Sequence, residues 1–213
     1  MRLFRLGTIC FPTWLRWSAL FIVLVILFAI SAPNAHQFLA VTQRVMDADT
    51  LVVEEWSADV VGQAAADEFK KGNYEHLLIS CLRGDRRENP LGHMQKSPEV
   101  HRMVALGIPK EKIVESYTPA TDHHQSASMA RGVRDTLRKM NIKSKGVNVM
   151  APATHARKTW LVHSRALFPQ TSAGIIAVQP GIYNPDRWWL NSKSAKWVLK
   201  NYIGLFYEWA TGL

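Results

Sequence analysis

The first hydrophobic feature of the chain is an uncharged run over residues 17–32, WSALFIVLVILFAISA. A bilayer core needs about 17 to 25 mostly apolar residues in a helix, so the pattern predicts one transmembrane helix from Trp14 to about Pro33. Three arginines precede the run, namely Arg2, Arg5 and Arg16. The positive-inside rule therefore predicts a single-pass protein of the bacterial inner membrane, with its N-terminus in the cytoplasm and its C-terminal domain in the periplasm.

A cleaved signal peptide is the alternative to this anchor, because Ala29, Ile30 and Ser31 resemble a small-x-small cleavage site. With the anchor retained, the predicted organisation has three parts. Residues 1–35 form the cytoplasmic N-terminus and the transmembrane anchor, residues 36–47 a linker, and residues 48–213 an α/β domain.

Beyond the linker, short apolar runs alternate with helix-length segments. The runs rich in β-branched residues predict five strands, at residues 50–53, 76–81, 112–116, 147–150 and 174–178. The segments between them predict four helices, at residues 58–71, 97–106, 125–140 and 155–168. Strands and helices in strict alternation predict a Rossmann-like three-layer α/β sandwich around a mostly parallel sheet of about five strands.

A final amphipathic helix is predicted between Ala195 and Trp209, where apolar residues recur every three or four positions. Two roles for it remain open. It packs on the sheet, or it lies on a membrane surface, as the four tryptophans from Trp188 onward suggest.

Charge and cysteine content narrow the classes of partner and metal. The chain has 26 lysines and arginines against 17 acidic residues, a formal charge of +9, which favours anionic partners. Its basic residues are scattered rather than clustered with aromatics, which argues against nucleic acid. Cys81 is the single cysteine beyond the apolar run, so the domain has no internal disulfide, and no Cys/His spacing predicts a metal site.

Polar residues gather where the predicted strands end. Parallel sheets bind ligands beyond the carboxyl ends of their strands, where helix N-termini converge. The strongest group is the sequence APATHARK at residues 151–158, in which Thr154 is the predicted N-cap of the next helix. Arg157 and Lys158 would oppose the helix dipole in its first turn. A bound anion between these cations and the backbone N–H groups explains that cost. The alternative is that both side chains are solvated or pair with a neighbouring acid.

Three other strand ends carry candidate residues. Asp122 is predicted to cap a helix, and either the neighbouring His124 or His155 could transfer a proton. Glu54 and Glu55 end the first strand and could bind a hydroxyl, a ribose or a metal, or form an ordinary pair of loop charges. Gly84 follows the second strand and is a further candidate for ligand binding.

Four segments of the exported part carry a resemblance to a known family. They are residues 51–56 (LVVEEW), 122–127 (DHHQSA), 155–158 (HARK) and 183–189 (YNPDRWW). In order and spacing the chain resembles a membrane-anchored bacterial subgroup of the ElyC/SanA/YdcF family, which is built on a DUF218-type domain, over roughly residues 48–207. The resemblance implies a role in cell-envelope or surface-polysaccharide biogenesis. For a soluble relative it implies S-adenosylmethionine binding, but it leaves the cofactor of this chain and any reaction unknown.

The chain departs from that family's sequence pattern at the residues expected to form the ligand pocket. Glu54-Glu55 stands where the broader family has glycine, and His123-His124 replaces an expected Arg-Thr pair. Bulky loop residues approach a phosphate less closely than glycine does. Binding of a nucleotide-like or phosphorylated group is therefore altered or lost if the family pocket serves that purpose.

Two functions follow as hypotheses. The first is a periplasmic domain that binds an anionic small molecule or a lipid-linked sugar intermediate during envelope assembly. If it is an enzyme, we expect a transferase or hydrolase that acts on a phosphorylated envelope precursor. In it Arg157 and Lys158 hold charge, His155 or His124 moves a proton, and Glu54 orients a hydroxyl or water. The second is a non-catalytic adaptor of an export complex that uses its tryptophan-rich C-terminus.

Overall fold

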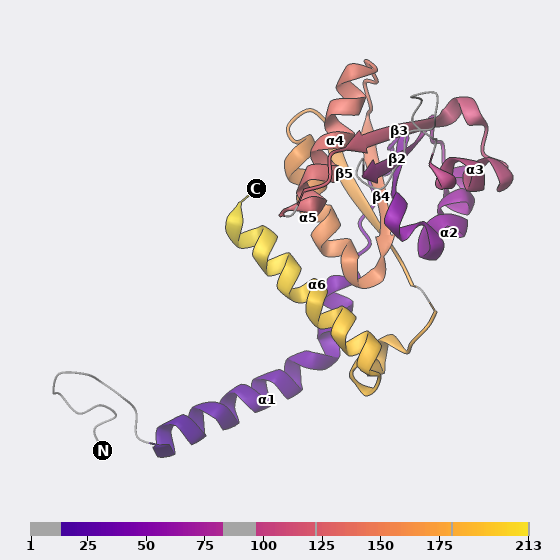
Figure 1. The fold of residues 1–213 in the computed structure, drawn as a ribbon. Coiled ribbons are helices and arrows are strands. Elements are labelled where there is room, and N and C mark those ends of the chain that lie inside the picture. The colour runs from indigo at the N-terminus through magenta and orange to yellow at the C-terminus, as the bar shows by residue number, and fades with distance from the viewer. Residues whose placement is uncertain (1–13, 83–96, 122, 180, 213) are drawn as a thin grey trace.

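A parallel five-stranded β-sheet with strand order β3-β2-β1-β4-β5 forms the centre of the protein (Figure 1). The computed structural model describes residues 14–82, 97–121, 123–179 and 181–212. The strands are β1 Thr50–Glu54, β2 His76–Leu82, β3 Ile113–Thr118, β4 Gly146–Pro152 and β5 Ser172–Val178. Every neighbouring pair is parallel. The Rossmann-like α/β prediction is confirmed.

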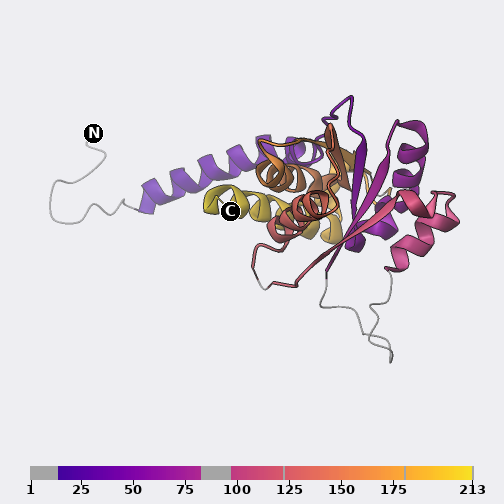
Figure 2. The same cartoon turned by 90° about the horizontal axis from the view of Figure 1, so that it is seen from above.

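Helices cover both faces of the sheet, as the view from above shows (Figure 2). They are α2 Ala58–Lys71, α3 Pro98–Ala105, α4 Gln125–Lys139 and α5 Ala156–Leu167. Side chains of a strand alternate between its two faces. Leu51 and Val53 thus pack against α2 and α3, while Val52 packs against α4 and α5. The chain reverses its direction of travel across the sheet between β1 and β4, and this reversal creates a topological switch point.

The starts of the helices differ in how they are capped. Ser97 caps α3, since its hydroxyl accepts a 3.2 Å hydrogen bond from the Glu99 amide. The predicted cap at Thr154 is wrong. Thr154 lies inside the short 3-10 turn η4, Ala153–His155, and the residue before α5 is His155, which makes no side-chain capping bond. α4 follows His124, which has a left-handed φ of 54°. Asp122 and Gly84 lie outside the described residues.

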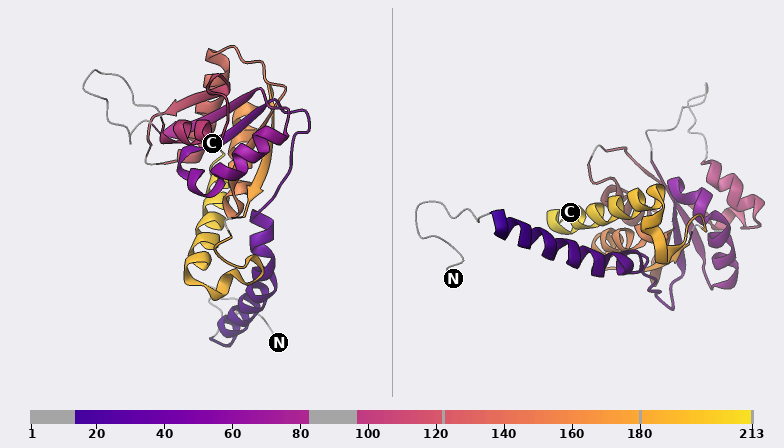
Figure 3. Two further views of the ribbon diagram at one scale, coloured as in Figure 1. Left: turned by 90° about the vertical axis from the view of Figure 1, so that its right-hand side faces the viewer. Right: turned by 90° about the horizontal axis from the view of Figure 1, so that it is seen from below.

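Two further helices pack together at one end of the domain. They are α1, Trp14–Leu39, and α6, Ser192–Thr211, which is preceded by the 3-10 segment η5, Pro185–Leu190. Leu39, Trp188 and Val198 form a small core between them. The closing helix therefore packs on the domain, and both helices extend from the same side of the sheet (Figure 3).

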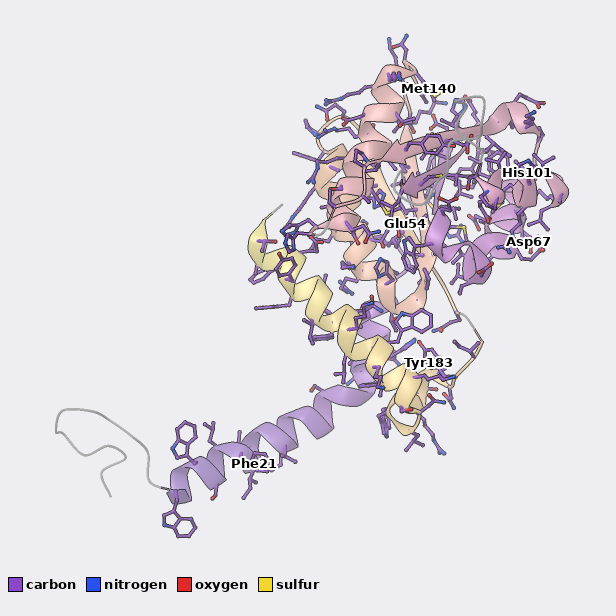
Figure 4. All side chains as sticks on the ribbon, in the orientation of Figure 1. Phe21, Glu54, Asp67, His101, Met140 and Tyr183 are labelled. Carbon is purple, nitrogen blue, oxygen red and sulfur yellow. The ribbon has the colours of Figure 1, made fainter. Side chains whose placement is uncertain are left out.

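The first part of α1 projects away from the domain (Figures 1 and 4). Apolar side chains along it are exposed, including Trp17 at 53%, Phe21 at 67% and Ile26 at 51%. In the part of the chain that the structure describes, no helix has both the length and the hydropathy that crossing a membrane requires.

Residues 36–47, the predicted linker, contact the domain at several points. The last turns of α1 run through Leu39, which is fully buried. Gln43 then forms an antiparallel bridge with Ile175 of the edge strand β5. The chain therefore reaches β1 along the surface of the sheet rather than through a free tether.

Candidate functional site

A pocket of about 950 Å³ lies near the switch point, beyond the carboxyl ends of β1 and β4. Its walls come from η1 (Glu55–Ser57), the start of α4, the η4–α5 junction and one face of α6. The residues that line it with polar or aromatic groups include Trp56, His124, His155, Lys158, Lys193, Lys196, Trp197, Lys200, Asn201, Tyr207 and Glu208. This is the edge at which an open parallel sheet binds its ligand.

Glu54, the last residue of β1, lies in the interior of the domain behind this wall (Figure 4). Its side chain is 1% exposed. The Trp56 indole N–H donates a 2.6 Å hydrogen bond to Oε2, whereas Oε1 has no partner among the described residues. Burial raises the pKa of Glu54 to about 7, against the opposing effects of the Trp56 hydrogen bond and the Lys158 charge.

His155 lies between Glu54 and α6. Its Nδ1 is 2.8 Å from Asn201 Oδ1, and its Nε2 is 3.9 Å from Glu54 Oε2. The Trp56 indole and the imidazole pack edge to face, with 4.7 Å between ring centres. Burial, and then the Lys158 charge, lowers the pKa of His155 to about 3, so the ring is neutral near pH 7.

The partners of Asn201 determine which His155 nitrogen carries the proton. The Asn201 amide N–H₂ donates to the Trp197 carbonyl at 3.0 Å and to the Thr154 hydroxyl at 3.2 Å. A carbonyl only accepts, so Oδ1 of Asn201 must face His155. A neutral His155 then carries its proton on Nδ1, and the lone pair of Nε2 has no partner in the described structure.

Lysines give the pocket its charge. Lys158 comes from the first turn of α5, and Lys193, Lys196 and Lys200 come from α6. Burial lowers the pKa of Lys158, while Glu54 and Glu208 act in the opposite direction. Glu208 is the single carboxylate on the described wall, and it lies 3.2 Å from His124. The excess of cations suits an anionic ligand.

His124 is held in place by α6. Its Nδ1 is 3.2 Å from Glu208 Oε2, and its Nε2 is 3.1 Å from the Tyr207 hydroxyl. The Tyr207 ring also stacks on the imidazole at 4.8 Å. Because both ring nitrogens have partners, His124 closes the wall between α4 and α6 and is less suited than His155 to transfer a proton to a ligand.

The structure does not bring Arg157 and Glu55 to the pocket wall. Successive helical residues point about 100° apart, so Arg157 faces away from Lys158 and packs over Phe38, with 4.1 Å from its guanidinium carbon to the ring centre. Its Nε also donates to the Phe38 carbonyl. Glu55 accepts a hydrogen bond from the Ser97 hydroxyl and so connects β1 to α3. The Thr154 hydroxyl accepts a hydrogen bond from the Asn201 amide.

The predicted residues that the pocket brings together are His155, Lys158 and His124, with Glu54 directly behind the wall. Sequence reasoning missed Asn201 and the three lysines of α6. The lysines could have been found from their spacing of three and four residues, which places them on one side of a helix. Asn201 stands in an apolar stretch, where nothing local marks its contact with His155.

Comparison with known proteins adds no relative. The sequence matches no protein-family model, and no curated protein is significantly similar to it.

Proposed function

We propose that the pocket binds an anionic, phosphorylated small molecule. The observation that carries this proposal is the convergence of Lys158, Lys193, Lys196 and Lys200 on one pocket near the switch point. The one carboxylate on its described wall, Glu208, is already engaged by His124. An anion there would be held by side-chain charge, without the glycine-rich loop that phosphate sites of this fold often use.

The pocket also offers aromatic surface. Trp56 is 46% exposed, and Trp197 lines the same wall. An indole face suits the apolar side of a sugar or the ring of a base. A nucleotide-like compound and a phosphorylated sugar, including a lipid-linked one, both combine a ring with phosphate. These are the ligand classes that we propose.

We place this activity at a membrane of the cell envelope, in line with the family resemblance. The proposal is supported by the uncharged run over residues 17–32 and by the exposed apolar side chains of α1. In this arrangement α1 anchors the domain in the inner membrane, with the domain in the periplasm. A C-terminal alkaline phosphatase fusion should then be active, and a reporter that works only in the cytoplasm should be inactive.

The alternative is an export-complex adaptor, and it receives less support. Trp188, one of the tryptophans on which it depended, is 2% exposed and packs in the small core between α1 and α6. The exposed aromatic surface that remains includes Trp189 and Trp209. The lysine pocket has no role in this alternative.

Titration with inorganic phosphate tests the proposal on the full-length protein in detergent. The variant combines Lys193→Gln, Lys196→Gln and Lys200→Gln, and we expect its phosphate affinity to fall at least tenfold at low salt. The matched control combines Lys110→Gln, Lys143→Gln and Lys145→Gln. These exposed lysines precede β3 and β4 at the opposite, amino edge of the sheet. The control variant therefore has the same change of net charge but leaves the pocket unchanged.

If both triple variants lose phosphate affinity equally, the loss comes from the change in net charge, and this result would contradict a specific site. Absence of phosphate binding to the wild-type protein would also reject the proposal. A nucleotide and a sugar phosphate, titrated in parallel, distinguish the two ligand classes by their affinity relative to phosphate.

A further inference from the structure

Two buried polar atoms without partners lie close together, one on the pocket wall and one directly behind it. Nε2 of His155 and Oε1 of Glu54 both lack a hydrogen-bond partner in the described part of the chain. Their side chains are 7% and 1% exposed. Buried polar atoms are nearly always satisfied, and exceptions in a pocket point to chemistry or to a ligand.

The distance between the two side chains fits one bridging oxygen. His155 Nε2 and Glu54 Oε2 are 3.9 Å apart, which is too long for a direct hydrogen bond. It is short enough for one oxygen to lie about 2.8 Å from both atoms. A water molecule there would donate one proton to His155 Nε2 and one to Glu54 Oε2, which also accepts from the Trp56 indole, while Oε1 keeps no partner among the described residues. Its lone pairs are then free to face a ligand in the pocket.

We propose that Glu54, His155 and Asn201 form a general-base centre that activates water for hydrolysis of a phosphate ester bound by the pocket lysines. The inference rests on the proposed function, because those lysines must hold the phosphoryl group. His155 is the catalytic base, and Asn201 is a positioning residue that acts through it. Glu54 holds the second proton of the water.

The step balances in atoms and charge. The water oxygen bonds to phosphorus while its proton passes to His155 Nε2. The P–O bond to the leaving group breaks, and the leaving oxygen takes a proton from the Lys158 ammonium group. His155 then releases its proton to solvent and Lys158 regains one, so that one water has been added across the ester bond.

Burial and the surrounding charges set the protonation of these groups. Burial first, and then the charge of Lys158, lowers the pKa of His155. The ring is therefore neutral near pH 7 with a free lone pair on Nε2, and it is a weaker base than an exposed histidine. Burial makes the Lys158 ammonium a stronger acid than an exposed lysine. Burial raises the pKa of Glu54 to about 7, and the charge of Lys158 acts in the opposite direction and favours its ionised form.

Nitrogen-15 NMR of the histidine rings in the full-length protein tests the geometry without a substrate. We expect His155 to carry its proton on Nδ1 near pH 7. His163 is an internal control, because its Nδ1 contacts the Thr159 carbonyl at 2.9 Å and its Nε2 also lacks a partner among the described residues. Phosphate should shift the Nε2 signal of His155 and leave that of His163 unchanged. A proton on Nε2 of His155 would overturn the assignment.

Hydrolysis of 4-nitrophenyl phosphate and bis(4-nitrophenyl) phosphate tests the chemistry. A positioned general base contributes about 10² to 10⁴ in rate, so His155→Gln should lose at least a hundredfold in kcat. Phosphate affinity should stay within about threefold. Asn201→Leu should lose much of the rate, and Asn201→Asp should restore part of it because a carboxylate also accepts from Nδ1–H. Its charge should move the acid limb of the pH profile to higher pH.

Two outcomes reject this centre while leaving the proposed function intact. The first is phosphate binding by the wild-type protein with no release of 4-nitrophenol from either ester. The second is a wild-type rate in the folded His155→Gln variant. Loss of phosphate binding in the wild-type protein instead rejects the proposed function itself.

Discussion

The guanidinium of Arg157 lies over the ring of Phe38, with 4.1 Å between its central carbon and the ring centre. Arg157 Nε also donates a hydrogen bond to the Phe38 carbonyl. Together the two contacts connect the first turn of α5 to the last turn of α1. Lys158, the next residue, lines the pocket on another side of the helix. Two adjacent cations that the sequence groups together thus have different roles.

Single substitutions should separate these roles. We expect Lys158→Gln to weaken phosphate binding at least fivefold, because it removes a partly buried cation from the pocket wall. Arg157→Gln should leave phosphate affinity within about twofold. It should lower the free energy of unfolding by about 1 kcal/mol through loss of the contact with Phe38. Calorimetric titration and chemical denaturation measure the two effects, and equal loss of affinity in both variants would contradict this division.

Glu54 should make the stability of the protein depend on pH. Burial raises its pKa from the ordinary value of 4.5 to about 7 in the folded state, so the folded protein binds the proton more tightly than the unfolded chain. Below about pH 4.5 the carboxyl is protonated in both states and leaves the free energy of unfolding unchanged. As the pH rises from there to about 7, ionisation lowers the free energy of unfolding, by about 3 kcal/mol in total.

The variant Glu54→Gln should therefore gain stability relative to the wild type across that window. The glutamine can still accept the Trp56 hydrogen bond, and it stays neutral. Denaturation curves at pH 5 and pH 8 give the measurement, with Glu75→Gln as a control at an exposed carboxylate. If the Glu54→Gln and wild-type stabilities keep a constant difference between the two pH values, the buried carboxyl does not titrate as described.

Much of the fold follows from local sequence. The β-branched runs that end near Val53, Met150 and Val178 alternate with segments of helical length, and such a pattern has few arrangements other than a parallel sheet with helices on both faces. The carboxyl edge of the sheet follows from the same reasoning. This is why His155 and Lys158 could be assigned to one site before any coordinates.

The part that could not be predicted depends on long-range packing. Asn201 reaches His155 only because α6 returns across the carboxyl edge of the sheet, and the two residues are 46 positions apart. His124 is closed off by Glu208 and Tyr207 for the same reason. The direction of Arg157 depends on Phe38, which is 119 positions away in the sequence. Local periodicity carries no information about such partners.

Gly174 should be intolerant of a side chain. A Cβ there would lie 2.1 Å from Asn148 Oδ1 and 2.7 Å from the Val45 nitrogen. Those atoms hydrogen-bond to each other at 2.9 Å and hold residues 43–45 on β5. Gly174→Ala should thus lower the free energy of unfolding by about 2 kcal/mol or more.

The matched substitution for Gly174→Ala is Gly204→Ala in α6. The nearest atom to a Cβ at Gly204 is Lys158 Cδ at 3.5 Å, an ordinary contact. Alanine is about 1 kcal/mol more favourable than glycine inside a helix, so this variant should be as stable as the wild type or more so. Thermal denaturation of both variants tests the pair, and equal destabilisation would show that the close approach at Gly174 is relieved by backbone shifts.

The two adjacent tryptophans of η5 should give opposite results in the test of the adaptor hypothesis. Trp188 is 2% exposed and packs between Leu39 and Val198, so Trp188→Ala should lower the free energy of unfolding by about 3 to 5 kcal/mol. Trp189 is 42% exposed, and Trp189→Ala should cost less than about 1 kcal/mol.

A loss of envelope function through Trp188→Ala therefore reports misfolding and says nothing about a partner. If Trp189→Ala abolishes function in a complementation assay while the protein stays folded and binds phosphate normally, the adaptor is the better description. Full complementation by Trp189→Ala, together with failure of the Lys193, Lys196, Lys200 triple variant, favours the pocket.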